Sequence, residues 1–215
     1  MITRTLHAAV AAAALALAVA PAPAGAATVP AVNVTPGPVT VAATIFTVGY
    51  RFQANERVGV RALGAFDLNQ DGIVGGADVG LWTLDGTLLA TATVPAGTNA
   101  GKIVGQFRYV GIDRVVLDAG TQYVLGSFST DPNSLFNANY GGVTLSTDPR
   151  ITLLRNRDIA LVSALTFPDR ESMFNIHLGS FGPNMLIAPV PVPAALPALA
   201  LALGALTLVG RRRRA

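Results

Sequence analysis

Apolar and polar residues alternate with a period of two through much of the chain between Val39 and Ile187. This is the period of a β-strand with one buried face, and turn-forming residues interrupt it at short intervals. No long apolar stripe with helical spacing appears in this part of the sequence. The pattern predicts strands over Thr44–Phe52, Val58–Phe66, Val79–Leu84, Thr87–Val94, Ile103–Val110, Arg114–Leu117, Gln122–Phe128, Ile159–Phe167 and Met173–Leu178.

The clearest pair of strands surrounds Asp85-Gly86. An Asp-Gly pair between two alternating runs favours a two-residue hairpin with a type I′ turn, in which both turn residues have positive φ. We therefore predict a hairpin that joins Val79–Leu84 to Thr87–Val94.

These short strands, without helices to carry parallel crossovers, indicate an all-β fold. We expect a single antiparallel β-sandwich, jelly-roll-like, over residues 39–187. The core is predicted to contain Phe46, Val60, Leu63, Leu81, Leu88, Phe107, Val116, Val124 and Phe128.

The start of the chain predicts a secretory signal peptide over residues 1–27. Arg4 precedes an apolar run from Ala8 to Ala20, and the small residues of Ala24-Gly25-Ala26 match the pattern that signal peptidase recognises. The apolar run is shorter than the roughly 20 residues that span a bilayer. We expect export, cleavage near Ala26 or Ala27, and a Pro-rich linker over residues 28–38.

The end of the chain, residues 188–215, predicts a tail that enters a membrane. A proline box leads into uncharged residues rich in Ala and Leu up to Gly210, and four arginines follow. This length is at the low end for a transmembrane helix, and the arginines favour the cytoplasmic side. The prolines keep the box extended, as a protease substrate must be. The residues of this signal are Val190, Pro191, Val192, Pro193, Ala194, Arg211, Arg212, Arg213 and Arg214.

This order of box, short helix and arginine cluster closely resembles the PEP-CTERM class of bacterial sorting signals, in the variant with a Val-Pro-Leu-Pro-Ala box. Val192 stands where that variant usually has Leu. The resemblance implies processing by an exosortase, a membrane protease, during export to the surface of bacteria that make exopolysaccharide. The alternative is an ordinary carboxy-terminal membrane anchor.

Four stretches of the middle region are similar to a bacterial domain of unknown function that often carries PEP-CTERM tails. They are Val60–Asp67, Val79–Trp82, Gly105–Val110 and Ala119–Gly126. The resemblance implies a β-sandwich and supplies no activity.

Residues 67–78 have the spacing of a calcium-binding loop. Oxygen ligands fall at positions 1, 3, 5 and 12, with Gly72 at position 6, as in an EF-hand loop. The aspartate at position 12 makes the loop similar to that of dockerins, although strands rather than helices are expected beside it. We predict Ca²⁺ ligands at Asp67, Asn69, Asp71, Ile73 (by its carbonyl) and Asp78; the alternative is an Asx-rich turn without an ion.

Composition excludes several other functions. The 215 residues include no Cys, which excludes disulfides, zinc–thiolate sites and a cysteine nucleophile. The net charge of +3 comes from the termini, so the middle region is slightly acidic and a poor partner for nucleic acid. His177 is the only histidine outside the predicted signal peptide, and no G-x-S-x-G motif is present.

We therefore expect a non-enzymatic protein at the cell surface or in the extracellular matrix, with Ca²⁺ as a candidate stabilising ion and its ectodomain ligand unknown. An alternative is a carbohydrate-binding module that contacts exopolysaccharide through Trp82, Tyr109, Tyr123 or Tyr140. A secreted hydrolase is a weaker alternative, because paired acids such as Asp113 and Asp118 are more simply explained as solvated strand ends.

Overall fold

A computed structural model describes residues 27–35, 46–99, 101–131, 136–137, 144–172 and 180–190. The described residues form antiparallel sheets and contain no helix, which confirms the all-β prediction. The predicted signal peptide and almost all of the predicted sorting tail lie outside them, and Val190 is the only described residue of the box. The part of the chain that the structure describes has no helix long and apolar enough to cross a membrane.

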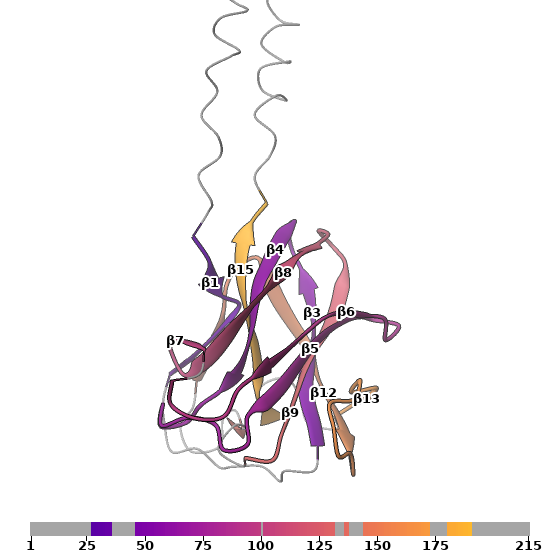
Figure 1. Ribbon diagram of the computed structural model, residues 1–215. Helices are drawn as coiled ribbons and strands as arrows, with labels where there is room; N and C mark the ends of the chain where they lie inside the picture. The colour runs from indigo at the N-terminus through magenta and orange to yellow at the C-terminus, as the bar shows by residue number, and fades with distance from the viewer. Residues whose placement is uncertain are drawn as a thin grey trace, which may run out of the picture. The chain divides into compact units, whose positions relative to one another are not determined.

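Two large sheets face each other in a β-sandwich-like arrangement (Figure 1). The five-stranded sheet has, in spatial order, β1 (Val29–Pro30), β15 (Pro183–Pro189), β4 (Val58–Phe66), β8 (Phe107–Leu117) and β7 (Lys102–Val104). The six-stranded sheet has β13 (Arg170–Glu171), β12 (Ile151–Ala160), β3 (Phe46–Ala54), β9 (Gln122–Ser129), β5 (Ala77–Thr83) and β6 (Leu88–Val94).

Two small ladders complete the described strands. β11 (Thr144–Thr147) pairs with β2 (Val32–Thr35), and β10 (Phe136–Asn137) pairs with β14 (Ser180–Phe181). Both β1 and β2 lie within residues 28–38, the segment that the sequence predicts as a linker. The side chain of Asn184 fixes this segment to β15, because it donates to the Val32 carbonyl at 2.7 Å and accepts from the Val32 amide at 3.1 Å.

The alternating pattern locates most strands. β4 spans the predicted residues 58–66, whereas the two strands predicted over 103–117 are mostly one continuous strand, β8. The strand predicted over Ile159–Phe167 is wrong: β12 ends at Ala160, Leu161 has a φ of 60°, and residues 161–169 contain no strand. The predicted strand Met173–Leu178 lies outside the described residues.

The core lies between the two sheets and is built from alternate residues of both. Val60, Leu63, Leu81 and Phe107 belong to it as predicted, and Val124 is buried as well. Phe46, Val116 and Phe128 are only half-buried, and Leu88 is wrong as a core residue because 51% of it is exposed. A β-bulge between Leu81 and Trp82 shifts the register of β5 against β6 where Trp82 pairs with Leu88. The alternation of inward and outward side chains along β6 is therefore interrupted just after Leu88.

The hairpin between β5 and β6 forms as predicted, but its turn type differs. Gly86 has a φ of 92°, whereas Asp85 has no positive φ, so a type I′ turn is wrong. The Gly86 amide donates to the Thr83 carbonyl at 3.1 Å, and the Thr83 amide donates to the Thr87 carbonyl at 2.9 Å. This pattern is that of a tight turn followed by a glycine bulge.

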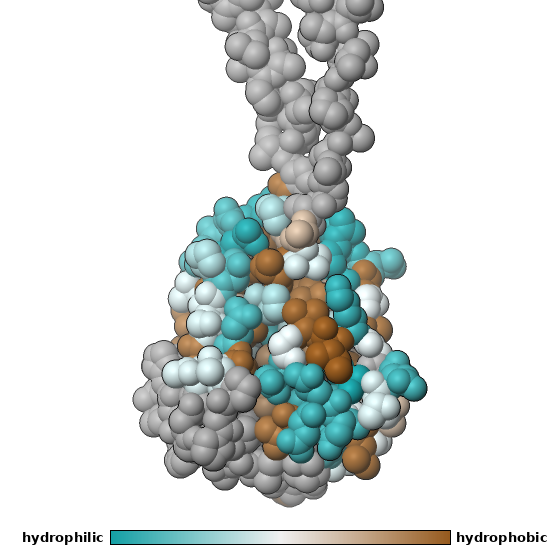
Figure 2. Space-filling view, turned by 90° about the vertical axis from the view of Figure 1, so that its left-hand side faces the viewer, coloured by the Kyte–Doolittle hydropathy of each residue, from teal (hydrophilic) through white to brown (hydrophobic). Residues whose placement is uncertain are grey.

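On the face shown in Figure 2, hydrophobic residues form a narrow strip between hydrophilic ones. Inside the sandwich, burial raises the pKa of both Tyr50 and Tyr109, because an ionised phenolate loses its hydration there. The cluster of buried residues between the sheets is mainly hydrophobic. The buried charged residues are Asp67 in the 67–78 loop, Arg108 on β8, Asp131 after β9 and Arg157 on β12.

Candidate functional site

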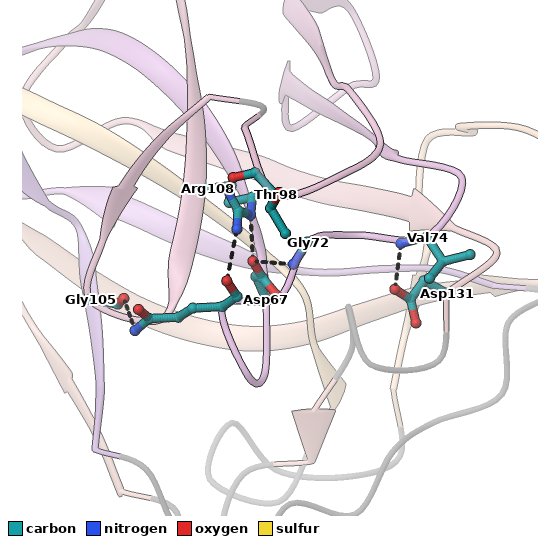
Figure 3. A network of polar contacts seen from close by, with 8 residues as sticks. Asp67, Gly72, Val74, Thr98, Gly105, Arg108 and Asp131 are labelled. Carbon is teal, nitrogen blue, oxygen red and sulfur yellow. Dashed lines mark hydrogen bonds and ion pairs between the residues drawn. The ribbon is translucent and has the colours of Figure 1, made fainter.

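The 67–78 loop joins β4 to β5 and is held by a buried arginine (Figure 3). Arg108, the second residue of β8, is 1% exposed. Its Nε donates to Oδ2 of Asp67 in a buried ion pair, its Nη1 donates to the Thr98 carbonyl at 2.5 Å, and its Nη2 donates to the Gln70 carbonyl at 3.0 Å. A guanidinium presents its donors in a fixed planar fork, so one side chain links three chain segments.

Asp67 shapes the first half of the loop. Its Oδ2 also accepts a hydrogen bond from the Gly72 amide at 3.2 Å, and its backbone carbonyl accepts one from the Gln70 amide at 3.3 Å. Gly72 has a φ of 100°, and a Cβ there would lie 2.5 Å from the Gly97 carbonyl carbon. Glycine is therefore required at this position by both backbone conformation and close packing. We call Asp67, Gln70, Gly72, Thr98 and Arg108 the Arg108 cluster.

A second buried carboxylate holds the other half of the loop. Asp131 follows β9, is 4% exposed, and accepts a hydrogen bond from the Val74 amide at 2.7 Å through Oδ2 (Figure 3). The Asp131 amide donates to Oγ of Ser129 at 3.1 Å, and that hydroxyl donates to the Gly76 carbonyl at 2.8 Å. The loop is thus fixed from β8 on one side and from the end of β9 on the other.

Ile73 sits between these two anchors. Its side chain is 1% exposed and belongs to the hydrophobic core. Its carbonyl accepts hydrogen bonds from the Gly76 amide at 3.2 Å and the Gly97 amide at 3.3 Å. The carbonyl that the sequence predicts as a metal ligand is therefore already used within the protein.

The structure does not bring the predicted calcium ligands together. Asp67 faces Arg108, Asn69 and Asp71 are exposed, and Asp78 lies on β5, where its Oδ1 accepts from Oγ1 of Thr93 at 2.6 Å. Among the described residues, no three His, Cys, Asp or Glu side chains form a group that would hold a metal. In this arrangement the guanidinium of Arg108 supplies the positive charge that faces Asp67.

The aromatic residues predicted as candidate sugar contacts are largely buried. Trp82, Tyr109 and Tyr123 are 5%, 2% and 5% exposed, and Tyr140 lies outside the described residues. The Trp82 ring lies 5.8 Å from the Phe167 ring in an edge-on arrangement, and the Arg157 guanidinium lies 5.4 Å from the same Phe167 ring. Trp82, Tyr109 and Tyr123 therefore pack inside the protein rather than on its surface.

Arg157 fixes the segment that carries Phe167. Its Nε donates to the Pro168 carbonyl at 2.7 Å and its Nη2 donates to the Asp169 carbonyl. Desolvation by burial lowers the pKa of Arg157. A Cβ on Gly126 would lie 3.2 Å from the side chain of Pro168. Because glycine has no Cβ, the segment that carries Phe167 and Pro168 can pack closely against the outer surface of the six-stranded sheet.

A small concavity of about 150 Å³ lies beside the loop, at the end of the outer surface of the six-stranded sheet. Gly75, Asp78, Thr93, Phe128 and Thr130 are among the residues that line it. Asp78 pairs in register with both Thr93 and Phe128, so one carboxylate, one hydroxyl and one aromatic ring share one face of adjacent strands. Sequence reasoning missed this set because its members come from three separate strands.

Arg108 and Asp131 were not predicted as partners of the loop. Arg108 is 41 residues from Asp67 and Asp131 is 57 residues from Val74, so neither contact leaves a local spacing pattern in the sequence. The one available signal is an arginine between two aromatic residues, Phe107 and Tyr109, inside the predicted strand Ile103–Val110.

No curated protein matches this chain. Residues 33–174 match the family described as Domain of unknown function (DUF4082), which spans β2 to β13 and contains the whole 67–78 loop. The match covers well over half of the chain. The chain therefore belongs to the DUF4082 family of domains of unknown function.

Proposed function

We propose that this protein is a non-enzymatic module displayed at the cell surface or in the extracellular matrix, with its carboxy-terminal tail as a sorting signal. The sequence of the two termini supports export, and the β-sandwich-like region between them supports display of a stable domain. The observation that carries the proposal is the order of the tail residues, a proline box, an uncharged run up to Gly210 and then four arginines. The loop with the strongest sequence signature of a site uses its buried carboxylate to hold the fold.

The sorting proposal is tested by replacing Arg211, Arg212, Arg213 and Arg214 with Ser in the full chain. Loss of the arginines removes the charge asymmetry that orients the helix, so we expect retention or misrouting in cell fractionation. Arg61→Ser, at an exposed position of β4, is the control and leaves sorting unchanged. The intact mass of the mature protein distinguishes the sorting signal from an ordinary membrane anchor. An exosortase-type protease removes part of the tail and lowers the mass, whereas an ordinary anchor keeps its full length. Normal sorting of the four-Ser variant contradicts the proposal.

We also propose that the Arg108 cluster, and not Ca²⁺, fixes the 67–78 loop. A dication at Asp67 would have to displace a guanidinium that already pairs with it. We expect the melting temperature to be the same in millimolar CaCl₂ and in chelator, and Asp71→Ala to change it little in either, because Asp71 is exposed. A calcium-dependent rise that Asp71→Ala abolishes would restore the calcium-binding interpretation.

A second candidate function is carbohydrate binding, and the concavity beside Asp78 favours it. A carboxylate, hydroxyls and an aromatic ring are groups that suit a sugar, and Phe128 is half-buried at this position. Exopolysaccharide is the partner that the sequence resemblance suggests. Titration of the protein with purified exopolysaccharide tests it: Phe128→Ala should abolish binding, whereas Trp82→Phe, at a buried ring, should not.

We propose further that the two large sheets form a jelly roll with three added strands. Without β7, β12 and β13, the sheets have the orders β1-β15-β4-β8 and β3-β9-β5-β6. If these eight strands are counted along the chain, the orders are 1-8-3-6 and 2-7-4-5, the arrangement of two interlocked Greek keys. β12 is then an extra strand added beside β3.

A further inference from the structure

The edge strand β6 differs from the other open edges of the two sheets. It ends the six-stranded sheet, and within the described ranges no strand pairs with its far side. Its seven residues, Leu88–Val94, contain no charge and no proline. An uncharged edge of this length presents unpaired amides and carbonyls that can accept another strand.

Each of the other edges has a feature that hinders pairing. β1 has only two residues, one of them Pro30, and β13 has only two, both charged. β12 beyond β13 has a bulge between Leu153 and Arg155, and β8 beyond β7 carries adjacent opposite charges. The charged residues on these edges are Lys102, Asp113, Arg114, Arg155, Arg170 and Glu171. Natural sheets use such features against edge-to-edge association, and the five residues Ala90–Val94 of β6, beyond the bulge at Leu89, lack them.

We propose that β6 pairs antiparallel with β6 of a second copy of this chain, about a two-fold axis at Ala92. The bulge between Leu81 and Trp82 leaves Ala90–Val94 as the regular part of the edge. In the proposed register Thr91 lies opposite Thr93 of the other copy, Ala90 lies opposite Val94, and Ala92 lies opposite itself.

The sequence of β6 supports this register. Thr91 and Thr93 are exposed on one face, whereas Ala92 and Val94 point toward the core and are buried. The two-fold therefore matches threonine with threonine on the outer face and small apolar residues on the inner face, which are favourable cross-strand pairs. The paired segment Ala90–Val94 carries no charge on either copy, and a two-fold interface closes at a dimer.

Two variants that differ in one residue test the register. Thr91→Lys with Thr93→Lys places lysine opposite lysine twice across the axis. Thr91→Glu with Thr93→Lys places glutamate opposite lysine twice, while each copy keeps the same Lys at 93 beside its own Asp78. Both variants lose the hydrogen bond from Oγ1 of Thr91 to the Val79 carbonyl, so that loss cancels in the comparison.

The measurement is sedimentation velocity of the full chain in mild non-ionic detergent, over about 1 to 100 μM. We expect a dimer for the unchanged protein and for the Glu/Lys variant, and dimerisation at least about tenfold weaker for the Lys/Lys variant. Thr152→Lys, at an exposed threonine of β12, is the control and leaves the dimer unchanged. A monomer at every concentration, or equal dimerisation of the two variants, overturns the proposal.

Hydrogen exchange of the unchanged protein gives an independent readout that does not depend on whether the variants fold. Amides of residues 90–94 that point away from β5 should exchange more slowly at high than at low concentration, and amides of β7 should not change. Equal exchange at both concentrations contradicts pairing through β6. Neither result affects the sorting proposal, which the tail variants test separately.

Discussion

Asp67 and Asp85 each follow the end of a β-strand and each fix a loop, but they do so by different means. Asp67 is 3% exposed and pairs with Arg108 from another strand. Asp85 is exposed and bonds only to Thr83 and Thr87, two residues away on either side. One aspartate links distant parts of the chain, whereas the other stabilises a turn that its neighbours already favour.

This difference indicates which polar contacts contribute most to the free energy of unfolding. A buried charge that loses its partner keeps the full cost of desolvation, whereas an exposed charge regains water. The contacts of Asp67 should therefore matter far more for stability than those of Asp85, although both use similar hydrogen bonds. Each prediction below tests this ordering.

The largest effect should come from removing the Arg108 charge. Arg108→Met leaves the Asp67 carboxylate buried without its counter-ion and leaves the Gln70 and Thr98 carbonyls without a donor. We expect the free energy of unfolding to fall by roughly 3–5 kcal/mol, measured by urea denaturation. Arg57→Met, which removes an exposed ion pair with Asp118, should cost less than about 1 kcal/mol.

A double variant shows whether the loss comes from the unpaired charge. Arg108→Met with Asp67→Asn removes both charges, so its loss of stability should be well below the sum of the two single losses. Strict additivity would mean that Asp67 and Arg108 do not act as a pair, and the comparison with Asp85 would fail.

An intermediate effect is expected at Asp131, whose carboxylate is buried but accepts from a backbone amide. Asp131→Ala removes the acceptor of the Val74 amide and should lower the free energy of unfolding by about 1–3 kcal/mol. Thr130→Ala, at the exposed neighbouring position, is the control. A loss as large as that of Arg108→Met would show that Asp131 stabilises the loop as strongly as the Arg108 cluster does.

The sequence predicted the sheets better than the loop because strand patterns are local. Alternation located β4, β5, β6 and β9 closely. It failed at β12, where Arg155, Asn156, Arg157 and Asp158 follow one another and hide the period. It also failed at β15, which begins and ends with proline.

The calcium-loop prediction stays a prediction, but the structure shows a contact of Asp67 that the loop motif did not contain. A loop with oxygen-bearing side chains around a glycine can bind a dication or form a hydrogen-bonded turn. The group that contacts these oxygens distinguishes the two cases. Here the partner is an arginine on β8, brought to Asp67 by the pairing of Phe66 with Phe107. That register depends on the whole sheet, so a local motif cannot show it.

The smallest effect is expected at Asp85, and it should depend on pH. Hydrogen bonds from Thr83 and Thr87 lower the pKa of this exposed carboxyl below its ordinary value. A lowered pKa in the folded state means that the stabilisation is present above the pKa of the unfolded chain, about 3.9, and is lost as the pH falls through the folded-state value. Asp85→Asn should therefore lower the melting temperature slightly at neutral pH and not at all in strong acid. Thermal unfolding of both proteins from about pH 7 to pH 2 measures this difference. A difference that stays constant over this range would show that the Asp85 charge does not stabilise the turn, and only the geometry of Thr83 and Gly86 would then define it.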